Sequence, residues 1–269
     1  MLPEYDGFMT DLQVTSKLQI QPQFSHRREW ETIASEEGLL YEALEFSAPA
    51  APGEDVPQDE KKAWYRESGR AFSVHGAFMG IDPACGDGQL RVLSRKRCLE
   101  SCRLAGELGA RNVVFHSSCG SFLRGPYMDS WASQCAAWYE ELAETCDLNI
   151  WIENSQDVDA GPIRELMKRI SDPRIGVCLD LGHVNYSRMP MAQWFEELGA
   201  WIGYLHLSDN NGLFDDHLPL GDGSVDWEAA DSFRRSLQRS VTMTLEVGGT
   251  EGVRKSVQYL KEHGLFGMG

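Results

Sequence analysis

The stretch that decides the fold reads PIRELMKRISDPRIGVCLDLGH and covers residues 162–183. Its first half places apolar residues at positions 163, 166, 167 and 170, the spacing of an amphipathic helix, and Pro162 stands at an early helical position. Residues 175–179 form a short apolar run, typical of a buried parallel strand, that continues directly into Asp180. The stretch therefore predicts a helix and then a buried strand that ends at a carboxylate.

The same alternation of strand and helix runs along the whole chain. Short apolar runs occupy residues 12–17, 39–46, 71–74, 112–115, 148–152, 175–179, 202–205 and 241–245. Helical patterns lie at residues 90–108, 130–146, 162–170, 191–201, 227–237 and 252–263. Eight strands that alternate with helices predict a (β/α)8 TIM barrel, and we expect one domain over residues 1–269. A doubly wound dinucleotide-binding sheet is disfavoured because no G-x-G-x-x-G motif follows a strand. Residues 48–60 are interpreted as an excursion after the second strand.

Charge and composition exclude several classes of protein. The chain has 269 residues and a formal net charge of −16, which disfavours nonspecific binding to nucleic acids or anionic membranes. It has no apolar run of about 18 residues, the length that a spanning helix needs. Its first ten residues lack the basic start of a signal peptide. Together with seven scattered cysteines, interpreted as reduced thiols, this predicts a cytoplasmic protein.

Six of the predicted strands run directly into a residue type that binds metals. These residues are His75, His116, Glu153, Asp180, His206 and Glu246, and three more lie nearby at His183, Asp215 and His217. In a barrel the carboxyl ends of all strands meet at one rim, where active sites are built. Carboxylates crowded at one rim repel one another unless cations lie between them. The pattern therefore predicts a divalent-metal site.

Several segments resemble one superfamily, the xylose isomerase-like TIM barrels. They are WIENS (151–155), GVCLDLGH (176–183), LHLSDNNG (205–212), DDHLPLGDGSVDW (215–227) and TLEVG (244–248). That superfamily contains sugar isomerases and epimerases together with AP endonuclease family 2. The resemblance is strongest from the fifth strand to the end of the chain.

The resemblance implies a set of metal ligands. In the isomerase branch, one divalent ion would lie among Glu153, Asp180, His206 and Glu246, a donor set that suits Mn²⁺, Mg²⁺ or Co²⁺ and also accepts Zn²⁺. In the endonuclease branch, His75 and His116 would join Glu153 on a second ion. A third ion would lie among His183, Asp215 and His217. We expect one ion on the first interpretation and up to three on the second.

The resemblance also implies an activity. We expect a sugar isomerase or epimerase in which Glu153 and Glu246 transfer protons through a metal-stabilised enediolate. Acidic loops at residues 82–87, 209–216 and 222–226 favour a small-molecule sugar over nucleic acid, and residues 221–227 look like the G-x-G-x-[IV]-D-W stretch of the isomerase branch. The alternatives are a multinuclear-zinc phosphodiesterase and a dehydratase on the same scaffold. The sequence is compatible with a homo-oligomer and leaves the oligomeric state open.

Overall fold

A closed barrel of eight parallel strands forms the centre of the molecule. The computed structural model describes residues 17–45, 57–120 and 123–268. The strands are β1 (Leu18–Ile20), β2 (Leu40–Leu44), β3 (Ala71–His75), β4 (Asn112–His116), β5 (Asn149–Glu153), β6 (Ile175–Asp180), β7 (Ile202–Leu207) and β8 (Thr242–Leu245). They follow one another in chain order, and β1 pairs with β8 to close the ring. The predicted TIM barrel is confirmed.

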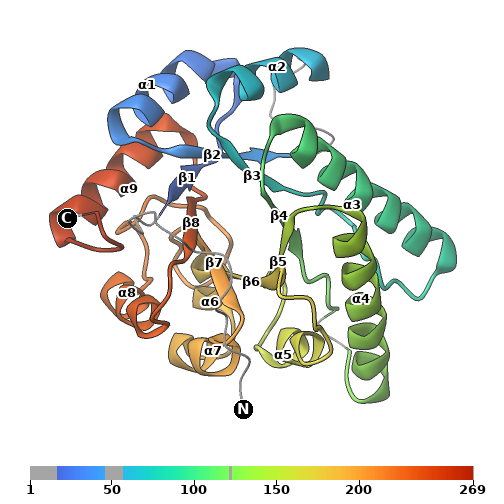
Figure 1. Ribbon diagram of the computed structural model, residues 1–269. Coiled ribbons are helices and arrows are strands. Elements are labelled where there is room, and N and C mark those ends of the chain that lie inside the picture. The colour runs from blue at the N-terminus through green and yellow to red at the C-terminus, as the bar shows by residue number, and fades with distance from the viewer. Residues whose placement is uncertain (1–16, 46–56, 121–122, 269) are drawn as a thin grey trace.

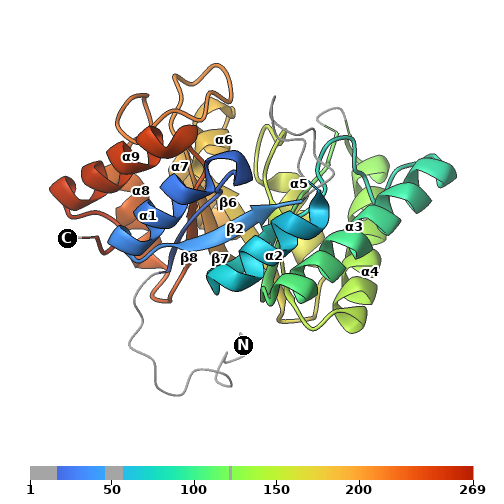
Figure 2. The same cartoon turned by 90° about the horizontal axis from the view of Figure 1, so that it is seen from above.

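Helices surround the strands, as Figures 1 and 2 show. They are α1 (Arg27–Glu37), α2 (Gln58–Ser68), α3 (Gly88–Leu108), α4 (Pro126–Thr145), α5 (Gly161–Met167), α6 (Leu181–Tyr186), α7 (Met191–Leu198), α8 (Trp227–Ser236) and α9 (Gly249–His263), with a short 3-10 helix at Phe24–His26. Their apolar stripes pack on the outer face of the barrel. For example, Ile163, Leu166 and Met167 of α5 are buried, as the helical spacing predicts.

The structure corrects the position of the first strand. The sequence predicts it at residues 12–17, of which 12–16 lie outside the described residues, whereas β1 is Leu18–Ile20. The apolar run is interrupted there by Gln19, which is fully buried and donates a hydrogen bond to the Tyr204 hydroxyl at 2.7 Å. Because a polar side chain points into the barrel at this position, β1 lacks the uninterrupted apolar run that marks the other strands.

Three helices were not among the predicted ones: α1, α2 and α6. Both α1 and α2 are mostly charged and bury few side chains, so their apolar stripes are narrow. Of the predicted excursion at residues 48–60, residues 48–56 lie outside the described residues, and α2 begins at Gln58. All seven cysteines are free. No helix in the described parts of the chain has the length and apolar character needed to cross a bilayer.

The barrel interior is partly polar, and this positions the site. Gln19, Glu42, Tyr204 and Thr244 come from four strands and are connected by hydrogen bonds inside the barrel. The Trp151 indole fills the space beside them. A Cβ atom at Gly176 or Gly203 would approach its ring to 2.5 Å, so both positions need glycine.

Candidate metal centre

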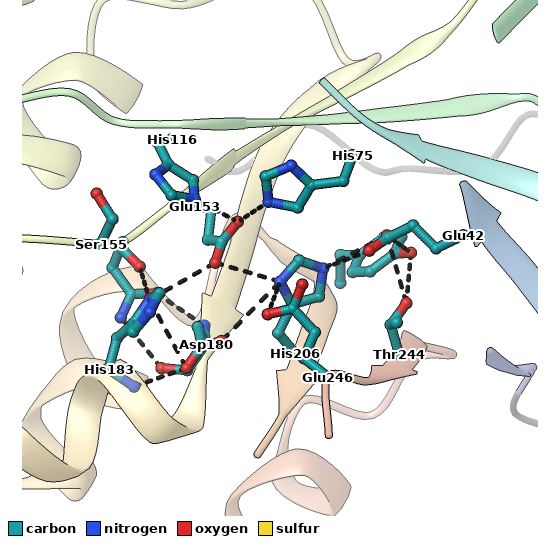
Figure 3. Close-up of polar contacts among 12 residues, drawn as sticks. Glu42, His75, His116, Glu153, Ser155, Asp180, His183, His206, Thr244 and Glu246 are labelled. Atoms are coloured by element: carbon teal, nitrogen blue, oxygen red, sulfur yellow. Dashed lines mark hydrogen bonds and ion pairs between the residues drawn. The ribbon is translucent and has the colours of Figure 1, made fainter. Parts of the chain in front are cut away.

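The six strand-end residues meet at one rim of the barrel. His75, His116, Glu153 and Asp180 are the last residues of β3, β4, β5 and β6. His206 is the next-to-last residue of β7, and Glu246 follows β8 directly. Figure 3 shows His75 and His116 on one side of Glu153, with Asp180, His183 and His206 on the other. The structure thus brings together the residues that the sequence selected.

Four of these residues form a buried group around one point, which we call the central group: Glu153, Asp180, His206 and Glu246. One ligand atom from each lies within 4.8 Å of the others. The Nδ1 atom of His206 is 3.2 Å from Glu153 Oε1, 3.2 Å from Glu246 Oε2 and 4.0 Å from Asp180 Oδ2. The donor set of three carboxylates and one imidazole is suited to a divalent ion.

The hydrogen-bonding of this group supports a metal. Glu153 Oε1 and Oε2, Asp180 Oδ2 and His206 Nδ1 are buried and have no hydrogen-bond partner among the described residues. A buried carboxylate oxygen without a partner is costly in free energy. Since these atoms converge on the same place, a divalent ion there would satisfy them together. The residues present therefore fit a metal.

Glu153 also belongs to a second group. Its Oε2 atom is 3.2 Å from His75 Nε2 and 3.6 Å from His116 Nε2, and these three residues can hold an ion of their own. Its Oε1 atom faces the central group. Glu153 is fully buried, and its two oxygens face different groups of ligands. Glu153 could therefore contribute one oxygen to each of two ligand groups.

A third group, which we call the outer group, lies nearer the solvent and consists of His183, Asp215 and His217. Asp215 Oδ2 is 3.2 Å from His183 Nε2 and 3.2 Å from His217 Nε2. His217 has a φ of 48°, in the left-handed region that non-glycine residues seldom adopt. Its conformation is held by a hydrogen bond from Nδ1 to the Glu246 carbonyl oxygen at 2.6 Å. The loop backbone therefore directs this imidazole toward Asp215.

Three of the histidines are oriented in the same way. The Nδ1 atoms of His75, His183 and His217 face the carbonyl oxygens of Gly76, Asn154 and Glu246 at 3.0, 2.6 and 2.6 Å. A ring nitrogen that donates to a carbonyl carries the proton, so the lone pair lies on Nε2. Each Nε2 faces a carboxylate of the site. The backbone thus sets the tautomer that binds a metal.

The pKa values describe how the ion-free chain balances its negative charge. Burial opposes protonation of His75, but the Glu153 carboxylate, 3.2 Å from its Nε2 atom, raises its pKa to about 9. Burial likewise opposes protonation of His217, and Asp215 raises its pKa to about 10. Burial raises the pKa of Asp180 to about 7. In the ion-free chain, these bound protons therefore offset part of the negative charge that metal ions would offset.

Sequence reasoning missed Glu42, Gln21 and Tyr204. Glu42 lies in the middle of β2 and is fully buried beside His206. The signal was a lone glutamate inside the apolar run LLYEAL, where a buried strand places its charged residue in the barrel interior. A search limited to the last residue of each strand does not include Glu42, because Glu42 lies in the middle of its strand.

The G-D-G-S-V-D-W stretch at residues 221–227 has a structural role. The buried Asp209 carboxylate accepts hydrogen bonds from the Gly221 and Val225 amides at 3.0 and 3.1 Å and from Trp227 Nε1 at 2.9 Å. A Cβ atom at Gly223 would lie 2.3 Å from Asp209 Oδ1. These bonds hold the loop that carries Asp215 and His217. The motif therefore stabilises the conformation of the loop and does not by itself indicate one particular reaction.

Comparison with known proteins agrees with this fold. The family model described as Xylose isomerase-like TIM barrel matches residues 33–263. Probable endonuclease 4 of Mycobacterium bovis is 26% identical over 208 residues, which are 67% of this chain and 81% of that protein.

Two solved structures extend the comparison. The TTHB071 protein from Thermus thermophilus, soaked with ZnCl2, is 27% identical with a TM-score of 0.72, and the match covers 91% of this chain and 97% of that protein. A D-tagatose 3-epimerase-like protein is 21% identical with a TM-score of 0.74, and the match covers 92% and 97%, which shows a shared fold.

Proposed function

This chain belongs to the xylose isomerase-like TIM barrel family, and we propose that within it the chain is a hydrolase of phosphoester bonds that uses up to three divalent ions. The observation that carries this proposal is the position of Glu153. Each of its oxygens faces a different ligand group, Oε1 toward His206 and Oε2 toward His75. A carboxylate engaged on both sides has no free oxygen for removing a proton from carbon. Glu153 would instead contribute a ligand oxygen to each of two groups, one with His75 and one with His206.

The residues of the site suit phosphoester hydrolysis. When bound, divalent ions activate a water molecule and stabilise the negative charge on the phosphoryl and leaving oxygens. His75 and His116 would hold one ion with Glu153, and the central group would hold another. Asp215 with His183 and His217 would hold the third at the more exposed side. The protein contributes by fixing the ligands before substrate arrives, since their tautomers are already set by the backbone.

The surroundings of the site favour a small substrate over a nucleic acid. The basic run at residues 91–97 is engaged within the protein: Arg91 donates to the Cys85 carbonyl at 2.6 Å and Arg95 to the Pro83 carbonyl at 3.0 Å. Arg97 pairs with Glu45 at 2.6 Å. A small molecule brings one phosphoryl group to the ions, whereas a duplex would lay many phosphates over the acidic loops. We therefore propose a small phosphoester as the substrate class.

A sugar isomerase or epimerase is the second candidate. The observation in its favour is that the central group is by itself a sufficient site for one ion. If His75 and His116 held no ion, Glu153 would keep one oxygen free and could act with Glu246 as the acid–base pair. The two candidates thus differ in how many ions the chain holds.

Metal content and activity distinguish the two candidates. Protein purified without chelator is analysed for metals, then assayed on a panel of phosphate mono- and diesters and for exchange of substrate C–H with D₂O on ketoses and aldoses. We expect two or three ions per chain and phosphoester cleavage. His217→Gln should reduce cleavage because it removes a ligand of the outer group, while His263→Gln, an exposed control on α9, should not. One ion per chain with C–H exchange and no cleavage would establish the isomerase instead.

A further inference from the structure

Glu42 is a buried carboxylate outside the three ligand groups. It lies in β2, is fully buried and contacts no residue of the outer group among the described residues. Burying a carboxylate costs free energy unless its oxygens receive hydrogen bonds. An apolar residue at this position would stabilise the barrel without that cost. A buried glutamate here therefore indicates a role other than stability.

Each oxygen of Glu42 is engaged by the residues around it. Oε1 accepts a hydrogen bond from Gln21 Nε2 at 2.8 Å and lies 3.2 Å from His206 Nε2. Oε2 accepts from the Tyr204 hydroxyl, from the Thr244 hydroxyl at 3.3 Å and from His206 Nε2 at 3.4 Å. Figure 3 shows Glu42 on one side of the His206 ring, and Glu153 and Asp180 on the other. The carboxylate is thus fixed with both oxygens within 3.4 Å of Nε2 of this ring.

The contact determines which nitrogen of His206 carries the proton. With Nε2 donating to Glu42, the lone pair lies on Nδ1, which faces Glu153 and Glu246 at 3.2 Å each. The other anchored histidines use the reverse arrangement, with Nδ1 on a backbone carbonyl: His75, His183 and His217. His206 is fully buried, and Glu42 reaches its Nε2 atom from β2. A carboxylate is also a stronger acceptor than a carbonyl and makes the opposite nitrogen a better metal ligand.

Gln21 extends the same network to a second ligand. Its Nε2 atom donates to Glu42 Oε1 and also to Glu246 Oε1, which leaves Glu246 Oε2 facing His206. Glu42 therefore orients His206 directly and Glu246 through one amide. Both residues belong to the central group.

We propose that Glu42 is a positioning residue that holds His206, and Glu246 through Gln21, in the orientation that binds the divalent ion of the central group. The proposal rests on the proposed metal centre and does not depend on which reaction the centre performs. Glu42 itself contributes no ligand atom to any of the groups that could hold an ion among the described residues.

The test compares two matched glutamate-to-glutamine substitutions. Glu42→Gln keeps the shape of the side chain but weakens the acceptor that faces His206. Glu45→Gln, three residues further along, is the control because Glu45 is also buried and pairs with Arg97 instead. Zn²⁺ affinity is measured by competition with a chelator. We expect Glu42→Gln to weaken binding by about 10- to 100-fold, and Glu45→Gln to leave it within about twofold of the parent chain.

A second measurement does not depend on metal or activity. The ¹⁵N shifts of the His206 ring in the ion-free protein report which nitrogen holds the proton. We expect Nε2 to carry a proton in the parent chain, with or without a second proton on Nδ1, and a changed proton distribution in Glu42→Gln. If Glu42→Gln does not fold, Gln21→Leu serves in its place, since it removes the half-buried amide and introduces no buried charge, and it should also weaken Zn²⁺ binding.

Three outcomes would overturn the proposal: unchanged Zn²⁺ affinity in a folded Glu42→Gln protein, an equal loss in Glu45→Gln, or a parent His206 ring protonated on Nδ1 and not on Nε2. The failure of the proposed hydrolysis would look different. The parent chain would then bind Zn²⁺ with the expected dependence on Glu42 and cleave no phosphoester.

Discussion

Removing the metal should make the stability of the protein depend on pH above neutrality. In the ion-free chain the pKa of His75 is about 9, against 6.5 for an ordinary histidine, because Glu153 holds its proton. The folded state therefore binds this proton more tightly than the unfolded state. The resulting stabilisation is fully present below pH 6.5 and is lost as the pH rises through 9.

The size of the loss follows from these two pKa values. Between pH 7 and pH 9 the contribution of His75 falls by about 2 kcal/mol, at 1.36 kcal/mol for each pKa unit. His217 acts in the same direction but is 40% exposed, so solvent screening reduces its share. The carboxyl of Asp180, whose pKa is raised to about 7, loses its own contribution mainly below this range. The pKa values of the buried His183 and His206 are also raised, so both act in the same direction, and His75 supplies about 2 kcal/mol of the decrease between pH 7 and 9.

The assay is urea unfolding at several pH values between 7 and 9.5, with chelator-treated and Zn²⁺-loaded protein. The treated protein should lose stability over this range, whereas the loaded protein should lose much less because the ion replaces the proton. His75→Gln should flatten the curve of the treated protein, and His263→Gln should leave it unchanged. Equal slopes with and without metal, or an unchanged slope in His75→Gln, would refute the reasoning.

Five further substitutions test other parts of the structure. Glu153→Gln should remove two ions from the metal content, because both oxygens are used, whereas Glu246→Gln should remove one; equal losses would argue against a bridging role. Asp209→Asn should lower the free energy of unfolding by about 2–4 kcal/mol in urea titrations, since the amide leaves buried donors of the 221–227 loop unsatisfied; a loss below about 1 kcal/mol would contradict this. Gly106→Ala, in α3 with open space at its Cβ, should raise thermal stability by about 0.5–1 kcal/mol. Gly182→Ala should lower the thermal stability, because the new Cβ would lie 2.3 Å from Ser208 Oγ. A Gly182→Ala protein more stable than Gly106→Ala would contradict this reasoning.

The repeating pattern of the chain predicted most of the fold. Seven strands and six helices lie close to their predicted positions, because burial on both faces produces apolar runs that are easy to recognise. The first strand was misplaced since Gln19 faces the polar barrel interior. Helices α1 and α2 were missed since their few buried residues, such as Trp30 and Trp64, make only a narrow apolar stripe.

The sequence by itself determined that His75, His116, Glu153, Asp180, His206 and Glu246 meet at one rim, because parallel strands in a closed barrel end on the same side. Only the tertiary structure decided how their atoms are used. Glu153 divides its oxygens between two ligand groups, and His206 turns Nδ1 to the site because Glu42, from a strand far away in the chain, lies behind it. The spacing of the strands along the chain determines at which rim each side chain lies. The direction of its donor atoms depends on residues from other strands, which come into contact with it only when the barrel closes.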